Sequence, residues 1–68
     1  MIIKVNGEAK EVSPGLTLHQ LLLDIEIDPS RPGIAVAINQ EVVLRTQWEE
    51  TEIQPESEIE IIRAAQGG

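Results

Sequence analysis

Short apolar stretches separated by turn residues make up most of the chain, and this pattern is typical of β-strands with one buried face. The first two stretches, residues 2–5 and 8–12, are separated by Asn6 and Gly7. Because both residues accept positive φ angles, the pair predicts a tight type I′ hairpin turn. A two-residue loop would place charged side chains of the second stretch on the apolar face of the first. We therefore expect the hairpin tip to overhang the core, or a bulge to shift the pairing.

The apolar positions of residues 18–25 recur with the period of a helix and not with that of a strand. Thr17 can cap this helix, and Gln20 three residues later completes a capping box. We expect the helix to end before a loop over residues 26–33, because Pro29 and Pro32 forbid its continuation. Its apolar stripe, at positions i, i+3, i+4 and i+7, consists of Leu18, Leu21, Leu22 and Ile25.

The second half of the chain predicts three more strands and one helical turn. Residues 34–38 predict a strand, and Asn39-Gln40 turns the chain into a short return strand over residues 41–44. Residues 46–50 predict a single helical turn with Thr46 as its cap. Trp48 is expected to pack at the edge of the sheet, and the alternative is that it is exposed as a binding hot spot for a partner.

The last strand, over residues 58–62, alternates isoleucine with glutamate. If Ile59 and Ile61 face the core, the residues between them face outward, because successive side chains in a strand point to opposite sides. An isoleucine exposed at position 62 has no use in keeping the domain soluble. We therefore predict a docking surface for a partner protein, which consists of Glu58, Glu60 and Ile62.

The chain ends in Gly67 and Gly68, which have no side chains to pack and resist regular structure. The pattern divides the chain into a domain over residues 1–63 and a flexible C-terminal tail over residues 64–68. Fully extended, the five tail residues reach at most about 18 Å. We predict that Gly68 is the reacting residue and that the rest of the tail enters the active site of a partner protein. These entering residues are Ala64, Ala65, Gln66 and Gly67.

Composition narrows the choice of partner and compartment. The 68 residues form one small domain, whose 12 acidic and 5 basic residues give a formal net charge of −7. This charge and a single aromatic residue argue against nucleic acid as a partner. The negative charge suits a partner with a basic docking surface. The alternative, which charge alone favours, is that the acidic residues only keep the domain soluble. No apolar stretch approaches the roughly 20 residues that span a membrane. With no cysteine and no expected signal peptide, the sequence favours a cytoplasmic protein.

Motifs for catalysis are missing from the sequence. It contains no phosphate-binding loop, no cysteine and no spacing typical of metal ligands. His19 is expected to be solvated on the helix surface, and Glu49 to Glu52 are expected to form a solvated acidic run. The terminal carboxylate is an unreactive anion at neutral pH, since its pKa is about 3.5. The protein is therefore not expected to be an enzyme, and its carboxylate needs activation by another protein, for example as a mixed anhydride with AMP.

The chain resembles the ThiS family of sulfur carriers of thiamine biosynthesis, within the ubiquitin-like β-grasp group. The most specific matches are the segment from Asn39 to Trp48 and the tail. Leu44 and the turn over residues 55–58 depart from the proline and the glycine-aspartate turn usual in the family, which affects loop geometry and not the tail. The full set of matching segments covers residues 5–7, 14–15, 17–22, 36–39, 42–43, 45–48 and 62–68.

The resemblance implies a fold and a chemistry. The fold would be α+β, a ubiquitin-like β-grasp in which a mixed four- to five-stranded sheet holds one main helix, with the last strand near the centre. An E1-like adenylyltransferase of the ThiF type would use ATP to adenylate Gly68, and the chain itself would bind no cofactor. Persulfide sulfur, from a donor such as a cysteine desulfurase, would then give a thiocarboxylate. A thiazole synthase of the ThiG type would take the sulfur, and the free carrier would be a monomer.

Three alternatives remain open at this point. A carrier for molybdopterin synthesis, of the MoaD type, would use the same chemistry for another product. A ubiquitin-like protein modifier would form isopeptide bonds to lysines. An acidic binding module would leave the tail without a chemical role.

Overall fold

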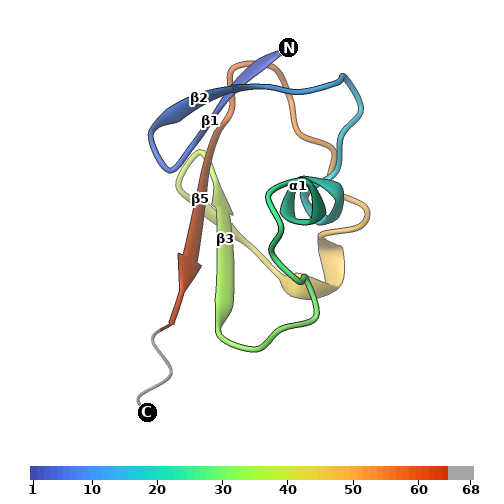
Figure 1. The fold of residues 1–68 in the computed structure, drawn as a ribbon, viewed down its shortest axis with the longest axis vertical. Coiled ribbons are helices and arrows are strands. Elements are labelled where there is room, and N and C mark those ends of the chain that lie inside the picture. The colour runs from blue at the N-terminus through green and yellow to red at the C-terminus, as the bar shows by residue number, and fades with distance from the viewer. Residues whose placement is uncertain (65–68) are drawn as a thin grey trace.

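A computed structural model of the protein describes residues 1–64 (Figure 1). Its strands form one five-stranded sheet in the order β2-β1-β5-β3-β4, in which only β1 and β5 are parallel neighbours. This mixed sheet with one main helix confirms the predicted fold class, and the last strand lies at the centre as predicted. The elements in chain order are β1 (Ile2–Val5), β2 (Glu8–Glu11), α1 (Leu18–Asp24), β3 (Ile34–Ile38), β4 (Glu41–Val43), the 3-10 helix η1 (Arg45–Gln47) and β5 (Glu58–Arg63).

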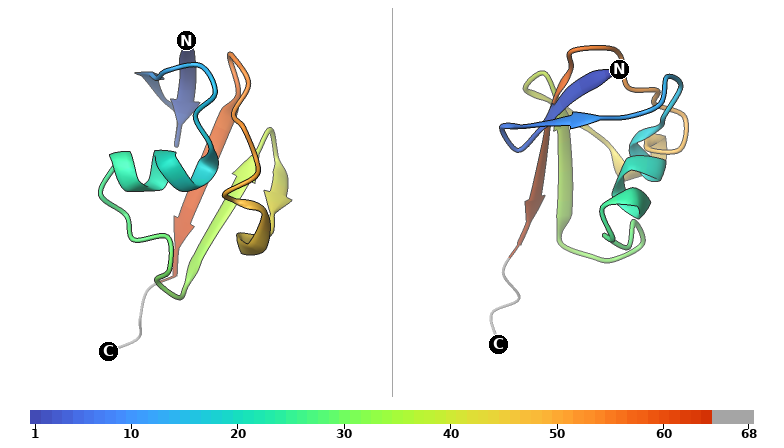
Figure 2. Two further views of the ribbon diagram at one scale, coloured as in Figure 1. Left: turned by 90° about the vertical axis from the view of Figure 1, so that its right-hand side faces the viewer. Right: turned by 45° about the horizontal axis from the view of Figure 1, so that its top comes forward.

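Helix α1 lies across one face of the sheet and leaves the other face open (Figure 2). Of the predicted apolar stripe, Leu18, Leu21 and Leu22 are fully buried. Ile25, the C-cap residue, is partly buried against the same core, so the stripe is confirmed. The predicted capping box is also present: the Gln20 N–H donates to Thr17 Oγ1 over 3.2 Å, and the Thr17 N–H donates to Gln20 Oε1 over 3.1 Å. The sheet contributes Ile3, Val36, Ile59 and Ile61 to the same core.

The helix ends for a different reason from the predicted one. Glu26 has a φ of 63°, and its N–H donates to Leu23 O over 3.1 Å. The Ile27 N–H donates to Leu22 O over 2.8 Å. These two bonds form a Schellman motif, which closes the helix after Asp24 with Ile25 as its C-cap. The prolines are therefore not what stops the helix, because it has already ended before Pro29.

The first hairpin has the predicted two-residue turn and no bulge. Asn6 and Gly7 have φ angles of 50° and 85°, as a type I′ turn requires. Val5 pairs directly with Glu8, so charged residues of β2 do share a face with apolar residues of β1. This register is possible because β2 contributes no buried side chain. The predicted bulge is therefore wrong, and the charged side chains of β2 stay outside the buried core.

The segment after β4 differs from the prediction in its cap. The strand ends at Val43, and the 3-10 helix begins at Arg45 with Leu44 at its N-cap and no side-chain cap. Thr46 therefore lies inside the helical turn and does not cap it. Trp48 is 2% exposed, and its Nε1–H donates to Val43 O over 2.9 Å. Its predicted packing role is confirmed, and the alternative of an exposed hot spot is wrong.

Candidate functional site

The central strand β5 leads the chain out of the domain, at the end opposite the N-terminus (Figure 1). It pairs with β3 from Ile38↔Ile59 to Ile34↔Arg63. The Ala64 N–H continues this ladder by donating to Gly33 O over 2.7 Å. Ala64, assigned from the sequence to the tail, is thus held to the body of the domain through its N–H. The other predicted tail residues, Ala65, Gln66, Gly67 and Gly68, lie outside the described residues, so the predicted division of the chain stays a prediction.

Two turn asparagines anchor β5 from its two flanks. On one flank, Asn6 Oδ1 accepts the Ile61 N–H over 2.8 Å, and Asn6 Nδ2 donates to Ile61 O over 3.3 Å. On the other flank, Asn39 exchanges bonds of 2.8 and 2.9 Å with the backbone of Glu58. Both asparagines have a φ of 50°. The sequence identified them as turn residues and missed this second role, because a local turn signal says nothing about a strand 19 or 55 residues away.

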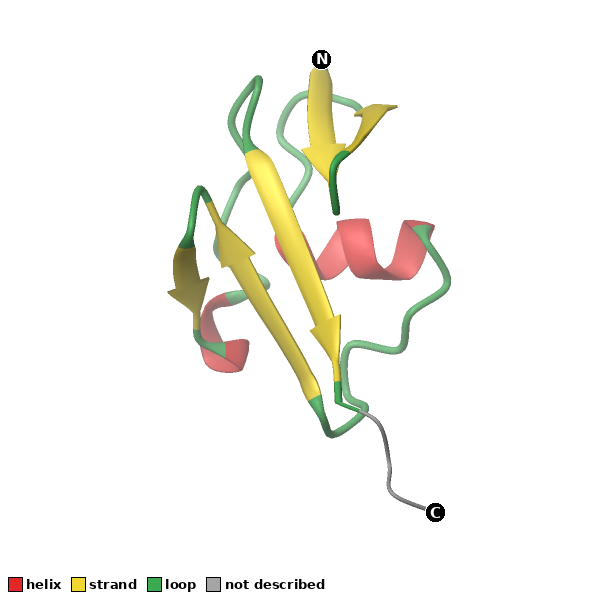
Figure 3. Cartoon of the chain, turned by 90° about the vertical axis from the view of Figure 1, so that its left-hand side faces the viewer, coloured by secondary structure: helices red, strands yellow, loops and turns green. Residues whose placement is uncertain are grey.

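Figure 3 shows the open face of the sheet, with α1 behind it. The predicted docking residues lie on this face. Glu58 and Glu60 are exposed, and Ile62 is 60% exposed, while Ile59 and Ile61 point into the core. The predicted alternation of outward-facing and inward-facing side chains in the last strand is therefore confirmed. Ile62 lies opposite the small side chain of Ala35, which leaves it uncovered.

Val42 adds to this face and was missed in the sequence. It is 74% exposed and pairs with Ala37, which in turn pairs with Glu60 of β5. The alternation of side chains along a strand could have predicted it. Val43 faces the core, so its neighbour Val42 must face outward. Ile62, Val42 and the glutamates of β5 thus share one face, and we call this set the open-face patch.

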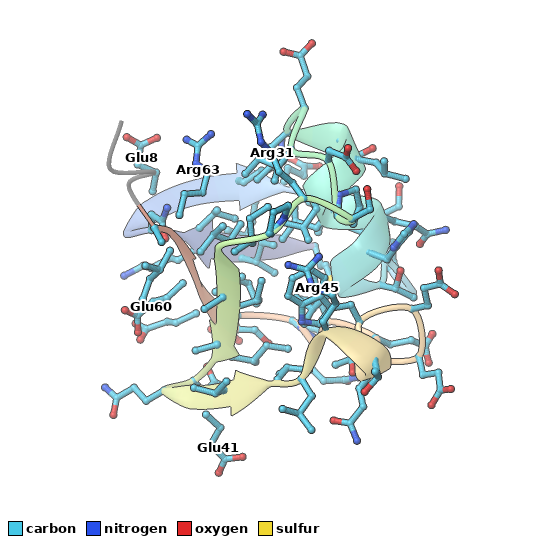
Figure 4. All side chains as sticks on the ribbon, turned by 90° about the horizontal axis from the view of Figure 1, so that it is seen from below. Glu8, Arg31, Glu41, Arg45, Glu60 and Arg63 are labelled. Carbon is cyan, nitrogen blue, oxygen red and sulfur yellow. The ribbon has the colours of Figure 1, made fainter. Side chains whose placement is uncertain are left out.

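Two arginines, Arg31 and Arg63, line one recess where the chain leaves the domain. Figure 4 shows Arg31 and Arg63 beside each other at this end, with Arg45 nearby. The Arg45 guanidinium donates to Pro29 O and, over 2.7 Å, to Arg31 O, and it lies 4.6 Å from the centre of the Trp48 ring. Arg45 therefore fastens the loop over residues 26–33 to the core. Gly33, at the end of that loop, accepts the bond from Ala64.

Ionisable groups of the described residues offer little support for catalysis. Hydrogen bonds from the Ser30 side chain and backbone lower the pKa of Asp28, an exposed carboxylate that forms a turn with Ser30. His19 keeps about a third of its side chain exposed on the helix surface, and its Nδ1 lies 3.7 Å from Glu49 Oε1, so it is solvated in part. Within residues 1–64, no three potential metal ligands gather into a group. No helix in this part is long and apolar enough to cross a membrane.

Comparison with known proteins assigns the family. The sequence model of the ThiS family matches residues 3–68. The chain belongs to the ThiS family. A curated ThiS relative, the sulfur carrier protein ThiS of Escherichia coli K12, is 35% identical over 68 residues that cover the whole of both chains. ThiS membership confirms the predicted carrier class and the prediction that the chain is not an enzyme.

Solved ThiS structures confirm the fold. The crystal structure of the thiamine biosynthesis protein ThiS from Geobacter metallireducens matches with a TM-score of 0.83 at 24% identity, and the match covers both chains completely. A solution NMR structure of a thiamine biosynthesis protein from the same organism matches with a TM-score of 0.81 at 24% identity. It is matched over all of this chain and 88% of that one. The β-grasp architecture predicted from the sequence is thus the ThiS fold.

Proposed function

We propose that this ThiS-family protein carries sulfur as a thiocarboxylate on Gly68 and donates it for thiazole formation in thiamine biosynthesis. The observation that carries this proposal is the anchoring of β5. The strand is bonded on both flanks up to Ile61 and remains tied to β3 up to Ala64. Only four residues separate Ala64 from the terminal carboxylate. The folded domain thus supplies a rigid base from which a short segment presents one reactive group.

The proposed reaction activates a group that is inert by itself. An oxygen of the Gly68 carboxylate attacks the α-phosphate of ATP, pyrophosphate leaves, and a mixed anhydride with AMP remains. The terminal sulfur of a persulfide then attacks the carbonyl carbon and displaces AMP, which gives an acyl disulfide. Attack of a thiol of the partner on the disulfide releases the thiocarboxylate. Glycines at positions 67 and 68 leave both faces of the carbonyl free of any Cβ.

The reaction assigns the partners by their chemistry. An E1-like adenylyltransferase of the ThiF type would supply ATP and the adenylation site, and a persulfide donor such as a cysteine desulfurase would supply the sulfur. A thiazole synthase of the ThiG type would accept it. The carrier would act in the cytoplasm as a monomer and would hold no cofactor of its own. Its net charge of −7 favours partners with basic docking surfaces.

We propose that the open-face patch is where the adenylating enzyme docks. Its centre combines the exposed Ile62 with the carboxylates of Glu58 and Glu60 on the same strand. A partner that covers this face would bury the isoleucine and pair the two glutamates with cations. The patch lies on the strand that leads to the tail, so docking there also positions the exit of the chain.

Changing Ile62 to glutamate tests this surface. Ile62→Glu is expected to weaken binding of the adenylating enzyme by about tenfold or more, because it places a charge in the apolar centre of the interface. The free energy of unfolding should change by less than about 0.5 kcal/mol, as is usual for an exposed position. Titration calorimetry and thermal melting measure the two effects.

Leu23→Glu is the matched control for that variant. Leu23 is 54% exposed, close to the 60% of Ile62, but it lies on the helix and not on the open face. The control adds the same charge and should leave binding within about twofold of the wild type. Equal affinities of the two variants would show that the open-face patch is not the docking surface.

The sulfur-carrier proposal itself is tested by intact mass after incubation with ATP, the adenylating enzyme and a persulfide donor. A carrier gains the mass difference between one sulfur and one oxygen atom. Covalent conjugates to lysines of other proteins would instead identify a modifier, and an unchanged mass would identify a binding module. Either of these two outcomes contradicts the proposal.

A further inference from the structure

The last residues of β5 have a neighbouring strand on one flank only. On the β3 flank the ladder reaches Arg63 and continues to Ala64. On the opposite flank, the pairing with β1 ends at Ile59, and the Asn6 side chain extends it only to Ile61. Beyond this point, no strand among residues 1–64 lies on that flank, as Figure 3 shows. The central strand of the sheet therefore becomes an edge strand where the chain leaves the domain.

The hydrogen bonds along β5 show which backbone groups face this free edge. Residues with even numbers direct their N–H and C=O groups to β3, as the bond from Ala64 to Gly33 shows. Residues with odd numbers direct them to the other flank, as the bonds of Ile61 with Asn6 show. Arg63 therefore presents its N–H and C=O to the open flank. No hydrogen bond within residues 1–64 engages either group.

Space for another chain segment exists beside this edge. Residues 26–32 pass the end of β5 without a backbone hydrogen bond to it. They leave a recess of about 270 Å³ next to Arg63 and Ala64. Its rim carries both signs of charge, with Arg31 and Arg63 opposed by Glu26 and Asp28. Charge alone therefore does not select an occupant, and the free donor and acceptor of Arg63 are the more specific feature.

We propose that an extended segment of the adenylating enzyme pairs with the open flank of β5 at Arg63 and adds a strand there. This inference rests on the proposed function, because its occupant is the enzyme that acts on Gly68. A backbone donor and acceptor on one strand edge are matched by an extended backbone, as in other cases of strand addition. Since at most about 18 Å of chain follows Arg63, the enzyme surface must lie close to this edge during the reaction. Pairing would hold the exit of the chain against the enzyme both before and during the reaction, so its contribution should appear in KM and not in kcat.

Hydrogen exchange of the unmodified protein tests the pairing directly. In the free protein the Arg63 amide should exchange faster than that of Ala64, which is bonded to Gly33. In the complex with the adenylating enzyme the Arg63 amide should become protected by about tenfold or more. An Arg63 amide that exchanges equally fast in the free and bound states would overturn the proposal. Protection of this amide by self-association of the free carrier would also overturn it, because the occupant would then be a second copy.

Arg63→Pro and Arg63→Ala separate the backbone from the side chain. Proline removes the N–H that faces the open flank, and it breaks no bond to β3, so the domain should keep its fold. The loss of this bond should raise the KM for adenylation about fivefold to tenfold with kcat little changed. Alanine keeps the N–H and should stay within about twofold of the wild-type KM.

Equal KM values for the two variants, with both folded by thermal melting, would refute the strand-addition proposal. Failure of the proposed function is distinguishable from this result. In that case the wild-type protein would itself not be adenylated, whereas a failure of strand addition leaves adenylation of the wild type intact.

Discussion

Deletion of Gly68 is expected to abolish sulfur loading while the domain remains folded. The shortened chain would still end in a glycine carboxylate, but its reach from the anchored Ala64 would fall by about 3.5 Å. A displacement of about 1 Å from a reactive geometry can already cost about a hundredfold in rate. We therefore expect the rate of adenylation to fall by at least about a hundredfold. Pyrophosphate exchange with the adenylating enzyme measures this rate.

Addition of one alanine after Gly68 is the companion to this deletion. It keeps every residue of the chain and moves the carboxylate one residue further on, so it should be equally inactive. Both variants should melt at the wild-type temperature, because none of the hydrogen bonds within residues 1–64 depends on the last residue. Retained sulfur transfer by either variant would contradict the assignment of Gly68 as the reacting residue.

Replacement of Trp48 by alanine should have the largest effect on stability. The Trp48 side chain is buried in the core, its Nε1–H donates to Val43 O, and its ring lies under the Arg45 guanidinium. Loss of a buried aromatic side chain costs about 3–5 kcal/mol. A domain of this length has a total stability of roughly 3–10 kcal/mol. We expect the melting temperature to fall by at least roughly 15 °C, measured by circular dichroism.

Two further variants show which property of Trp48 matters. Trp48→Phe keeps an aromatic ring and removes the Nε1–H that donates to Val43 O, so it should cost about 1–3 kcal/mol. Leu44→Ala changes an exposed neighbour and should cost less than about 0.5 kcal/mol. If Trp48→Ala melted no lower than Leu44→Ala, the indole would not be part of the stabilising core.

Local signals in the sequence were sufficient for most of the fold. The capping box at Thr17 and Gln20 depends on residues three apart, and the turns at Asn6-Gly7 and Asn39-Gln40 depend on neighbouring residues. These interactions can be predicted from a short segment of sequence, because both partners lie within that segment. The alternation in β5 was equally informative, because it placed Ile62 outside the core before any neighbouring strand was known.

The interactions that the sequence did not reveal are those whose partners are decided by the folded chain. The Schellman motif uses Glu26 in a left-handed conformation where glycine is usual, so its common signature is missing. Arg45 binds backbone carbonyls of a loop 14 and 16 residues earlier, and these accept bonds whatever their side chains are. The free edge at Arg63 depends on where β1 ends relative to β5. That register is set by the packing of the whole sheet.

The anchoring of β5 fixes the place where the chain leaves this small domain. Asn6 and Asn39 hold the strand on its two flanks, and Ala64 is bonded to Gly33 where the strand ends. In the proposed function, the enzymes that act on the carboxylate would recognise the folded surface and find the end of β5 at a fixed place. The proposal thus assigns recognition to the domain and reactivity to Gly68.

The most direct test of this account is the location of the sulfur after loading. The chain contains no cysteine, so a thiocarboxylate would be its one strongly nucleophilic sulfur. Loaded protein would be treated with iodoacetamide at neutral pH and fragmented in a mass spectrometer. We predict one alkyl group on sulfur at the carbonyl of Gly68, and none on protein incubated without ATP. Absence of the label from Gly68 after loading, or an equal label without ATP, would contradict the account.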